Sequence, residues 1–327
     1  MSAHLRLGSR GSKLALVQSE WVRDRLTELH PGLHVTIDVI HTTGDKLLDA
    51  PLAKIGEKGL FTKELETALF DARVDLAVHS AKDMPTAIPA GLAIAAFTRR
   101  EDVRDVFVAG AGLGGKSAPG RLADLPLGAT VGSSSLRRRS QLLALRPDLH
   151  VVDIRGNVQT RLRKLADEGL AGTVLAAAGL ARLDSSGLAA FAFAFDEMLP
   201  AVGQGSLALE TRAADVRTRE LVLALQHEPS ARAVRAERAL MARLEGGCQV
   251  PIAALGEVQS DAVELGEPEL DGTQLRLRGY VGSLDGSETC RAEVAGSPRQ
   301  PEAVGVALAE LLLARGAERI LTAVRGA

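Results

Sequence analysis

The chain has 327 residues, of which 46% are hydrophobic and 24% are charged, and its formal net charge is −2 at pH 7. This composition excludes disordered and fibrous proteins, and the length is typical of two or three globular domains. The slight negative charge argues against a nucleic-acid partner, and no apolar run approaches the roughly 20 residues of a membrane helix. The start of the chain has no apolar signal core, so we expect a cytoplasmic protein without a membrane partner.

The first hundred residues alternate apolar strands with helical segments, which is the pattern of a parallel α/β sheet. Ser12 has the side chain of a helix N-cap, and Pro31-Gly32 ends the helix that follows it. The predicted strands are 5–8, 34–40, 75–79 and 92–98, and the predicted helices are 12–29 and 62–71. The charged segment 99–105 is expected to cross to a second unit.

The next hundred residues repeat this pattern and predict a second α/β unit of similar size. Its predicted strands are 105–109, 129–132, 151–154 and 173–177, and its predicted helices are 135–146 and 157–168. A glycine-rich loop at 110–120 and the glycines of 203–205 are candidates for movement. A further strand at 207–210 is expected to return to the first unit.

The last hundred residues predict a third, α+β domain. Its expected elements are a helix at 230–245, strands at 252–257 and 274–283, a turn at 285–286 and a helix at 302–315. The sequence therefore predicts a first α/β domain at 1–99 plus 206–226, a second at 105–199 and a C-terminal α+β domain at 230–327.

Cys248 is one of only two cysteines and lies in the segment Glu245-Gly-Gly-Cys-Gln-Val-Pro251. The glycine pair permits a tight turn and Pro251 prevents the helix from continuing, so we expect an accessible thiol on a short loop. The alternatives are a small buried hydrophobe or the nucleophile of a cysteine hydrolase, which needs a histidine base nearby. Neither the two cysteines nor the seven histidines have the spacing of a disulfide framework or a metal site.

Polar loops follow several predicted strands, where ligands bind in open α/β sheets. The loop 79–85 joins a hydroxyl, a cation and a carboxylate, and its alternative is a capped loop with a local ion pair. The segment 132–139 opens a helix with serines and arginines, and its alternative is an N-cap followed by a solvated arginine face. The segment Arg155 to Arg161 again places arginines and polar residues after a predicted strand and at the start of a predicted helix.

Three smaller segments extend this pattern. Arg10-Gly-Ser12 follows the first strand, Lys58-Gly-Leu-Phe61 places a lysine and an aromatic ring beside a glycine, and Pro200 to Gly205 is either a hinge with a polar contact or an ordinary loop. Arginine is suited to a bidentate grip on carboxylates, so the sequence predicts a polyanionic ligand that spans both α/β units.

With these segments in view, the chain resembles the porphobilinogen deaminase family over almost its whole length. The segments that carry the resemblance are His-Ser-x-Lys-Asp-x-Pro, Ser-Ser-Leu-Arg-Arg, Ile-Arg-Gly-Asn-Val-x-Thr-Arg, Leu-Pro-Ala-Val-Gly-Gln-Gly and Glu-Gly-Gly-Cys-Gln-Val-Pro, in the family's order. The resemblance implies a transferase of haem-type tetrapyrrole biosynthesis. Members condense four porphobilinogen molecules head to tail, release ammonia at each step and form hydroxymethylbilane on a covalently held dipyrromethane primer.

The resemblance also implies a role for individual residues. Cys248 would hold the dipyrromethane cofactor by a thioether, and Asp83 would be the catalytic carboxylate, a buried anion near the pyrrole N–H groups, with Lys82 beside it. The binding residues for the acidic cofactor and substrate would be Arg10, Ser12, Gln18, Lys58, Phe61, Ser80, Ser133, Ser135, Arg137, Arg138, Arg155, Gly156, Arg161, Arg182 and Gln204.

The implied fold has two periplasmic-binding-protein-like α/β domains around a cleft and a smaller C-terminal domain, in a monomer without metal. Ser133 stands where relatives often have threonine, and Lys13 replaces a common proline. Arg139 and Cys290 match no functional position. Arg139 is expected on the surface, and Cys290 is expected to be a packing residue. A solute-binding protein would share the architecture but has no use for Cys248, and a nucleic-acid protein would not explain Asp83.

Overall fold

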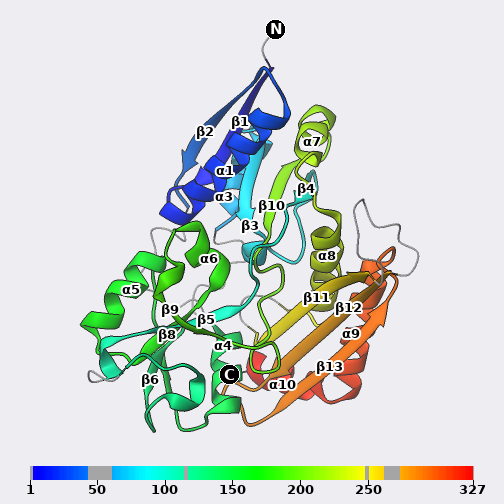
Figure 1. Ribbon diagram of the computed structural model, residues 1–327. Coiled ribbons are helices and arrows are strands. Elements are labelled where there is room, and N and C mark those ends of the chain that lie inside the picture. The colour runs from blue at the N-terminus through cyan, green and yellow to red at the C-terminus, as the bar shows by residue number, and fades with distance from the viewer. Residues whose placement is uncertain (1–2, 43–60, 114–116, 247–249, 261–272, 327) are drawn as a thin grey trace. The chain divides into compact units, whose positions relative to one another are not determined.

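The computed structural model describes residues 3–42, 61–113, 117–246, 250–260 and 273–326 (Figure 1). The chain forms two compact units, Met1–Glu101 with Gly205–Ala231 and Asp102–Gln204 with Arg232–Ala327, and each is described by itself. In the described ranges, no helix combines the length and the apolar character that crossing a membrane requires.

The first unit is built on a five-stranded sheet in the order β2-β1-β3-β10-β4 (Figure 1). Strands β1 (Ala3–Arg10), β2 (Leu33–Ile40) and β3 (Leu76–Ser80) are parallel neighbours. Strand β10 (Leu207–Arg212) runs antiparallel to both β3 and β4 (Leu92–Phe97). The four strands of the first hundred residues therefore run in one direction, as the sequence predicts, and the returning strand β10 is antiparallel to its two neighbours, so the sheet as a whole is mixed.

Three helices accompany this sheet: α1 (Lys13–Leu29), α3 (Lys63–Phe70) and α7 (Val216–Leu223). Ser12 caps α1 as predicted, since its Oγ accepts a hydrogen bond from the N–H of Ala15 at 3.3 Å. Val22 and Leu26 on α1 are fully buried in the same core cluster as strand residues of β1 and β3. Burial of this apolar face holds α1 on the sheet and fixes where the chain turns after β1.

The second unit contains a five-stranded sheet of the same design, in the order β7-β6-β8-β5-β9. Strands β6 (Thr130–Gly132), β7 (His150–Val152) and β8 (Gly172–Ala176) are parallel, while β5 (Asp105–Ala109) is antiparallel to β8 and to β9 (Ala189–Ala192). Its helices are α4 (Leu136–Leu145), α5 (Val158–Asp167) and α6 (Ala177–Arg182). The core contains Phe107, whose ring stacks on Phe191 with centroids 5.2 Å apart.

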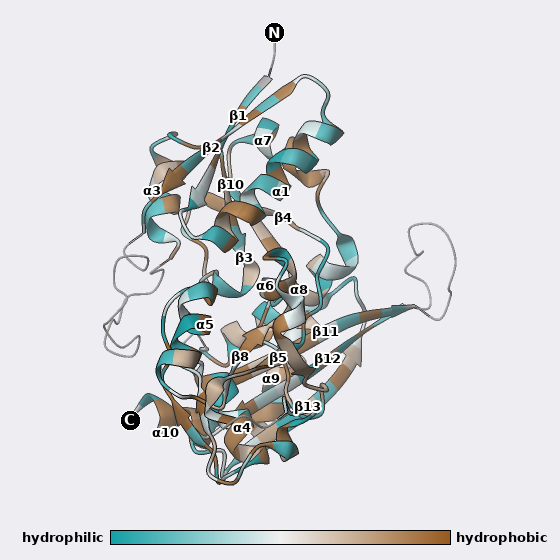
Figure 2. Cartoon of the chain, turned by 60° about the vertical axis from the view of Figure 1, so that its left-hand side comes forward, coloured by the Kyte–Doolittle hydropathy of each residue, from teal (hydrophilic) through white to brown (hydrophobic). Residues whose placement is uncertain are grey.

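The same unit holds a three-stranded antiparallel sheet of β11 (Ile252–Ser260), β12 (Thr273–Gly282) and β13 (Thr289–Gly296). Helices α8 (Glu228–Arg243), α9 (Pro301–Ala314) and α10 (Ala317–Arg325) accompany it, and the largely apolar α9 appears mostly brown in Figure 2. The hydroxyl groups of Ser140 on α4 and Tyr280 on β12 are hydrogen-bonded at 2.7 Å, which joins this sheet to the preceding one.

The predicted fold class, α/β with a smaller α+β part at the C-terminus, is confirmed. Sequence reasoning placed the long strands and helices within a few residues of their observed ends. It did not predict α6, α7, α10, β9 or β13. Helix α6 has only six residues, which is too short to show a helical period, whereas β13 alternates polar and apolar residues from Thr289 to Val294 and was missed despite this signal.

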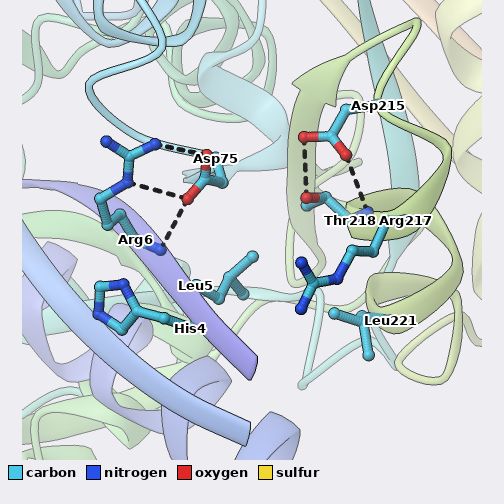
Figure 3. Close-up of a pocket in the computed structure, with 8 residues that line it drawn as sticks. All are labelled: His4, Leu5, Arg6, Asp75, Asp215, Arg217, Thr218 and Leu221. Carbon is cyan, nitrogen blue, oxygen red and sulfur yellow. Dashed lines mark hydrogen bonds and ion pairs between the residues drawn. The ribbon is translucent and has the colours of Figure 1, made fainter. Parts of the chain in front are cut away.

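Asp75 directly precedes β3 (Figure 3) and connects this strand to arginines of β1 and β10. These contacts allow a test of what stabilises the first unit. Its carboxylate accepts hydrogen bonds from Arg6 Nη2 at 2.8 Å and from Arg212 Nη2 at 2.9 Å. Burial alone would raise the pKa of Asp75, but the bonds from Arg6 and Arg212 outweigh it and lower that pKa.

Asp75→Asn is expected to lower the free energy of unfolding at pH 7 by about 1–3 kcal/mol, because charge-assisted hydrogen bonds are lost. Since the folded state lowers the pKa of Asp75, its contribution is present above the ordinary carboxyl pKa of about 4 and disappears as the pH falls. Urea unfolding of both proteins at pH 7 and pH 3 measures this. Equal stabilities at pH 7 would show that the ion pairs contribute nothing.

Candidate active site

A pocket in the first unit collects six of the residues predicted to bind or act on a ligand. We call it the Asp83 pocket, and its lining residues are Arg10, Ser12, Leu14, Ala15, Gln18, Phe61, Thr62, Val78, His79, Ser80 and Asp83. The six predicted residues come from segments up to 73 positions apart, and the fold brings them together.

The sheet explains this convergence. β1 and β3 are parallel neighbours, so the loops after Arg10 and after Ser80 leave the same edge of the sheet. The chain after β3 forms a single 3-10 turn, Ala81–Asp83, which ends in the carboxylate of Asp83. Lys82 in this turn is half-buried and is not among the residues that line the pocket.

Several contacts order the pocket. The guanidinium of Arg10 lies over the ring of Phe61, 4.1 Å from its centroid. Nε2 of Gln18 donates a hydrogen bond to Oγ of Ser80 at 3.1 Å. Asp83 is exposed, which differs from the buried anion that the resemblance implied. Its carboxylate is therefore open to a ligand in the pocket.

His79 also lines the pocket, and sequence reasoning gave it no role. Its Nε2 lies 3.0 Å from Oε2 of Glu210 on β10, and both side chains are buried. Burial raises the pKa of the Glu66 carboxyl on α3, and the charge of Glu210 adds to that effect. The sequence signals were the place of His79 at the start of the polar loop 79–85 and that of Glu210, a carboxylate at the end of the apolar run Leu207 to Leu209.

A larger pocket of the same unit lies at the opposite end of β1 (Figure 3). It is lined by His4, Leu5, Arg6, Asp75, Asp215, Arg217, Thr218 and Leu221. None of the predicted site residues lines it. Figure 3 shows that Asp75 and Asp215 each receive hydrogen bonds from residues drawn beside them, so much of its polar lining is already paired.

In the second unit, the loops after β6 and β7 form a second group of predicted residues. The N–H of Ser133 donates to the carbonyl of Val152 at 2.7 Å, and Oγ of Ser134 donates to the carbonyl of Ile154 at 3.0 Å. These bonds tie the two loops together at the edge where the parallel strands end. Ser135 caps α4, because its Oγ accepts from the N–H of Arg138 at 3.4 Å.

Arg137 and Arg138 open α4 and point into the protein. Each is 6% exposed, and both hydrogen-bond to the carboxylate of Asp105, which is completely buried. The solvated arginine face that the sequence left open as an alternative is therefore excluded for this pair. Asp105 was not predicted as a site residue.

The loop after β7 contains Arg155 and Gly156. Gly156 has φ of +113°, and a Cβ there would lie 2.5 Å from Cγ2 of Thr160, so this turn requires glycine. The Nε of Arg161 donates to the carbonyl of Gly156 at 2.8 Å, whereas Arg155 is half-buried and makes no hydrogen bond or ion pair within the described ranges. Arg182 is half-buried at the end of α6, after β8.

The remaining predicted residues divide into two groups. Gln204 is 1% exposed, and its Nε2 donates to the carbonyl of Val103 at 2.8 Å and to Oδ1 of Asp105 at 3.1 Å. Cys248 and Lys58 lie outside the described residues, as does part of the glycine-rich loop 110–120.

Helix α8 ends at Arg243, and Cys290 is buried in the C-terminal core as expected. The described ranges contain no cluster of histidine, cysteine, aspartate and glutamate side chains that could hold a metal ion.

These features define the class of protein: an α/β protein with arginines, hydroxyl groups and the open carboxylate of Asp83 where its strands end. Residues 5–220 match the family model "Porphobilinogen deaminase, dipyromethane cofactor binding domain", and residues 231–314 match that of the porphobilinogen deaminase C-terminal domain. The chain belongs to the porphobilinogen deaminase family, which confirms the resemblance found in its sequence.

Curated relatives match along almost the whole chain. The porphobilinogen deaminase of Moorella thermoacetica is 51% identical over 321 residues, which is 98% of this chain and 96% of the relative. That of Syntrophotalea carbinolica is 50% identical over 324 residues, or 99% of this chain and 96% of the relative.

Among solved structures, the methionine binding protein MetQ matches with a TM-score of 0.43 and 12% identity, over 68% of this chain and 89% of MetQ. The periplasmic aliphatic sulphonate binding protein SsuA from Escherichia coli matches with a TM-score of 0.40 and 14% identity, over 75% and 71% of the two chains.

Proposed function

We propose that this protein is a transferase that condenses four porphobilinogen molecules head to tail, with release of ammonia, to give hydroxymethylbilane for tetrapyrrole biosynthesis. The observation that carries the proposal is the Asp83 pocket. It brings together an open carboxylate, a guanidinium stacked on an aromatic ring and three hydroxyl groups, in a chain that belongs to this family along its length.

The residues of the chain fit a dipyrromethane cofactor. Each of its pyrroles carries two carboxylates, which suit guanidinium and hydroxyl donors, and an N–H, which suits a carboxylate. Arg155 has every guanidinium donor available within the described ranges, and Asp83 is exposed. When bound, the cofactor would supply the free pyrrole carbon to which the first substrate unit is joined, and each later unit would join the pyrrole added before it. We propose Cys248 as its point of attachment.

Asp83 is the proposed catalytic residue. A porphobilinogen that loses ammonia becomes a cation, and a fixed carboxylate beside its pyrrole N–H stabilises that charge as it develops. Lys82, its neighbour in the 3-10 turn, is the proposed second catalytic residue. Its ammonium can donate a proton or bind a substrate carboxylate.

The remaining predicted residues are proposed to bind the carboxylates and ring faces of cofactor and substrate. In the first unit these are Arg10, Ser12, Gln18, Lys58, Phe61 and Ser80. In the second unit they are Ser133, Ser135, Arg137, Arg155, Gly156, Arg161 and Arg182, whereas Arg138 and Gln204, which hydrogen-bond to Asp105, are proposed to support the binding residues from behind. The division into three domains, the monomeric state and the cytoplasmic location stay predictions from the sequence.

A turnover assay tests this function. Purified protein incubated with porphobilinogen should release four molecules of ammonia for each hydroxymethylbilane formed. Consumption of porphobilinogen without a linear tetrapyrrole, or no consumption at all by protein of the correct fold, would contradict the proposal.

Arg155→Leu is expected to raise the KM for porphobilinogen or to lower the cofactor-loaded fraction by about tenfold or more, because one charge-assisted contact to a carboxylate is lost. The free energy of unfolding should change little, since Arg155 has no partner within the described ranges. Steady-state kinetics, intact-mass spectra and urea unfolding measure the three quantities. Arg163→Leu, an exposed arginine on α5, is the matched control.

A further inference from the structure

Asp105, Arg137, Arg138 and Gln204 form a buried polar cluster in the second unit, which we call the Asp105 cluster. Oδ2 of Asp105 accepts a hydrogen bond from Arg137 Nη1 at 2.6 Å. Oδ1 accepts from Arg138 Nη2 at 2.7 Å, from Arg138 Nε at 3.2 Å and from Gln204 Nε2 at 3.1 Å. Asp105 is 0% exposed, so a single carboxylate orders three side chains without help from solvent.

The cluster carries an unbalanced charge. Two guanidinium groups share one carboxylate, which leaves one net positive charge on side chains that are 6% exposed or less. Burial alone would raise the pKa of Asp105, but the charges of Arg137 and Arg138 outweigh it and hold that pKa well below its ordinary value. An uncompensated buried charge is costly, so an anionic group that reached the cluster would be stabilised there.

The two arginines differ in the donors they have left. Arg138 uses all three guanidinium nitrogens, because Nη1 also donates to the carbonyl of Val174 at 2.8 Å. Arg137 uses only Nη1, which donates to Asp105 and to the carbonyl of Leu199 at 2.7 Å. Within the described ranges, Nε and Nη2 of Arg137 make no hydrogen bond. These two nitrogens have the parallel arrangement that binds a carboxylate in a bidentate manner.

We propose that Asp105 is a positioning residue for the transferase reaction. It fixes Arg137 so that Nε and Nη2 are presented to a ligand carboxylate, while Arg138 braces the carboxylate of Asp105. This deepens the proposed function and rests on it. Asp105 never touches the ligand. Gln204 acts through Asp105, because its Nε2 holds Oδ1 in place while its neighbour Gly205 begins the return to the first unit.

Asp105→Asn tests the proposal. The amide is neutral and has one acceptor oxygen, so the two guanidinium groups repel each other and Arg137 loses its fixed orientation. We expect the cofactor-loaded fraction, the affinity for porphobilinogen measured as KM, or both, to fall by about tenfold or more, with a smaller change in kcat of the loaded enzyme. Citrate, a polycarboxylate probe, should raise the Tm of the parent protein, and this rise should be absent in Asp105→Asn.

Asp75→Asn is the matched control, because Asp75 also accepts hydrogen bonds from two arginines but lies at the far end of its own sheet. It should lose stability and keep the loading, the KM and the response to citrate of the parent protein. If Asp105→Asn matches Asp75→Asn in all three, Asp105 is only a structural brace and the proposal is overturned.

A second variant decides the case in which Asp105→Asn does not fold. Gln204→Met keeps the volume and both ion pairs but removes the donor to Oδ1, so KM or loading should change by about two- to fivefold. Unchanged values overturn the proposal. The two proposals can fail separately. If citrate raises the Tm of the parent protein but not of Asp105→Asn, and the parent protein does not consume porphobilinogen, the proposed function is refuted while Asp105 still positions Arg137 for a carboxylate.

Discussion

Asp83→Asn is expected to lower the turnover of porphobilinogen by a factor of about 10³, because a neutral amide cannot stabilise the cation formed when ammonia leaves. The protein should stay folded and loaded with cofactor. Asp83 is exposed and makes no hydrogen bond or ion pair within the described ranges, so its charge contributes little to stability. Initial rates at saturating substrate measure the change.

The control for this variant is Asp71→Asn. Asp71 is an exposed carboxylate of the same unit, it lies outside the Asp83 pocket, and its weak pair with Arg73 at 3.8 Å is also exposed. Its turnover should equal that of the parent protein. An Asp83→Asn protein that keeps more than about a tenth of the parent rate would assign the catalytic charge to another group.

Cys248→Ser is expected to abolish turnover. In the proposed attachment, the sulfur of Cys248 would form a bond to a pyrrole methylene carbon, the bond from that carbon to nitrogen would break, and the nitrogen would leave as ammonia with the thiol proton. A serine hydroxyl is a much weaker nucleophile than a thiolate at neutral pH, so this bond does not form. The intact mass should be that of the bare chain.

Cys290→Ser is the matched control for the cysteine. Cys290 is 8% exposed and lies in the C-terminal core, and burial raises the pKa of its thiol, which keeps it protonated and unreactive. This variant should keep its cofactor and its turnover. A Cys248→Ser protein that still carries a dipyrromethane, or a Cys290→Ser protein that lacks one, would place the attachment elsewhere.

The sequence predicted the parts of the site that depend on local signals. Ser12 and Ser135 stand where a helix cap is required, and the strand before each polar loop has a clear apolar run. Parallel strands end at a common edge, so residues from separate loops, such as Arg10 and Ser80, could be assigned to one site without a structure.

What the sequence did not predict are the pairings across strands and between sheets. Asp105 begins a strand and looked like part of a charged crossover, yet it is the partner of two arginines more than 30 residues away. Glu210 and His79 are 131 residues apart and meet only because β10 returns beside β3. Such contacts depend on register and strand direction, and periodicity reports neither.

The direction of the returning strand was also not predicted from the sequence. Residues 207–210 read as a buried strand in either direction, because an apolar run shows burial on both faces but not orientation. The long excursion through the second unit brings β10 back in the antiparallel sense. In the second unit, β5 occupies the same position and has the same sense.

The central claim is that this chain carries a covalent dipyrromethane and uses it to build a tetrapyrrole. The most direct test is the intact mass of the parent protein, purified from cells that make porphobilinogen. We predict a mass above that of the sequence by one dipyrromethane, which increases in steps of one pyrrole unit when porphobilinogen is added. A mass equal to that of the bare chain, unchanged by porphobilinogen, would contradict the claim.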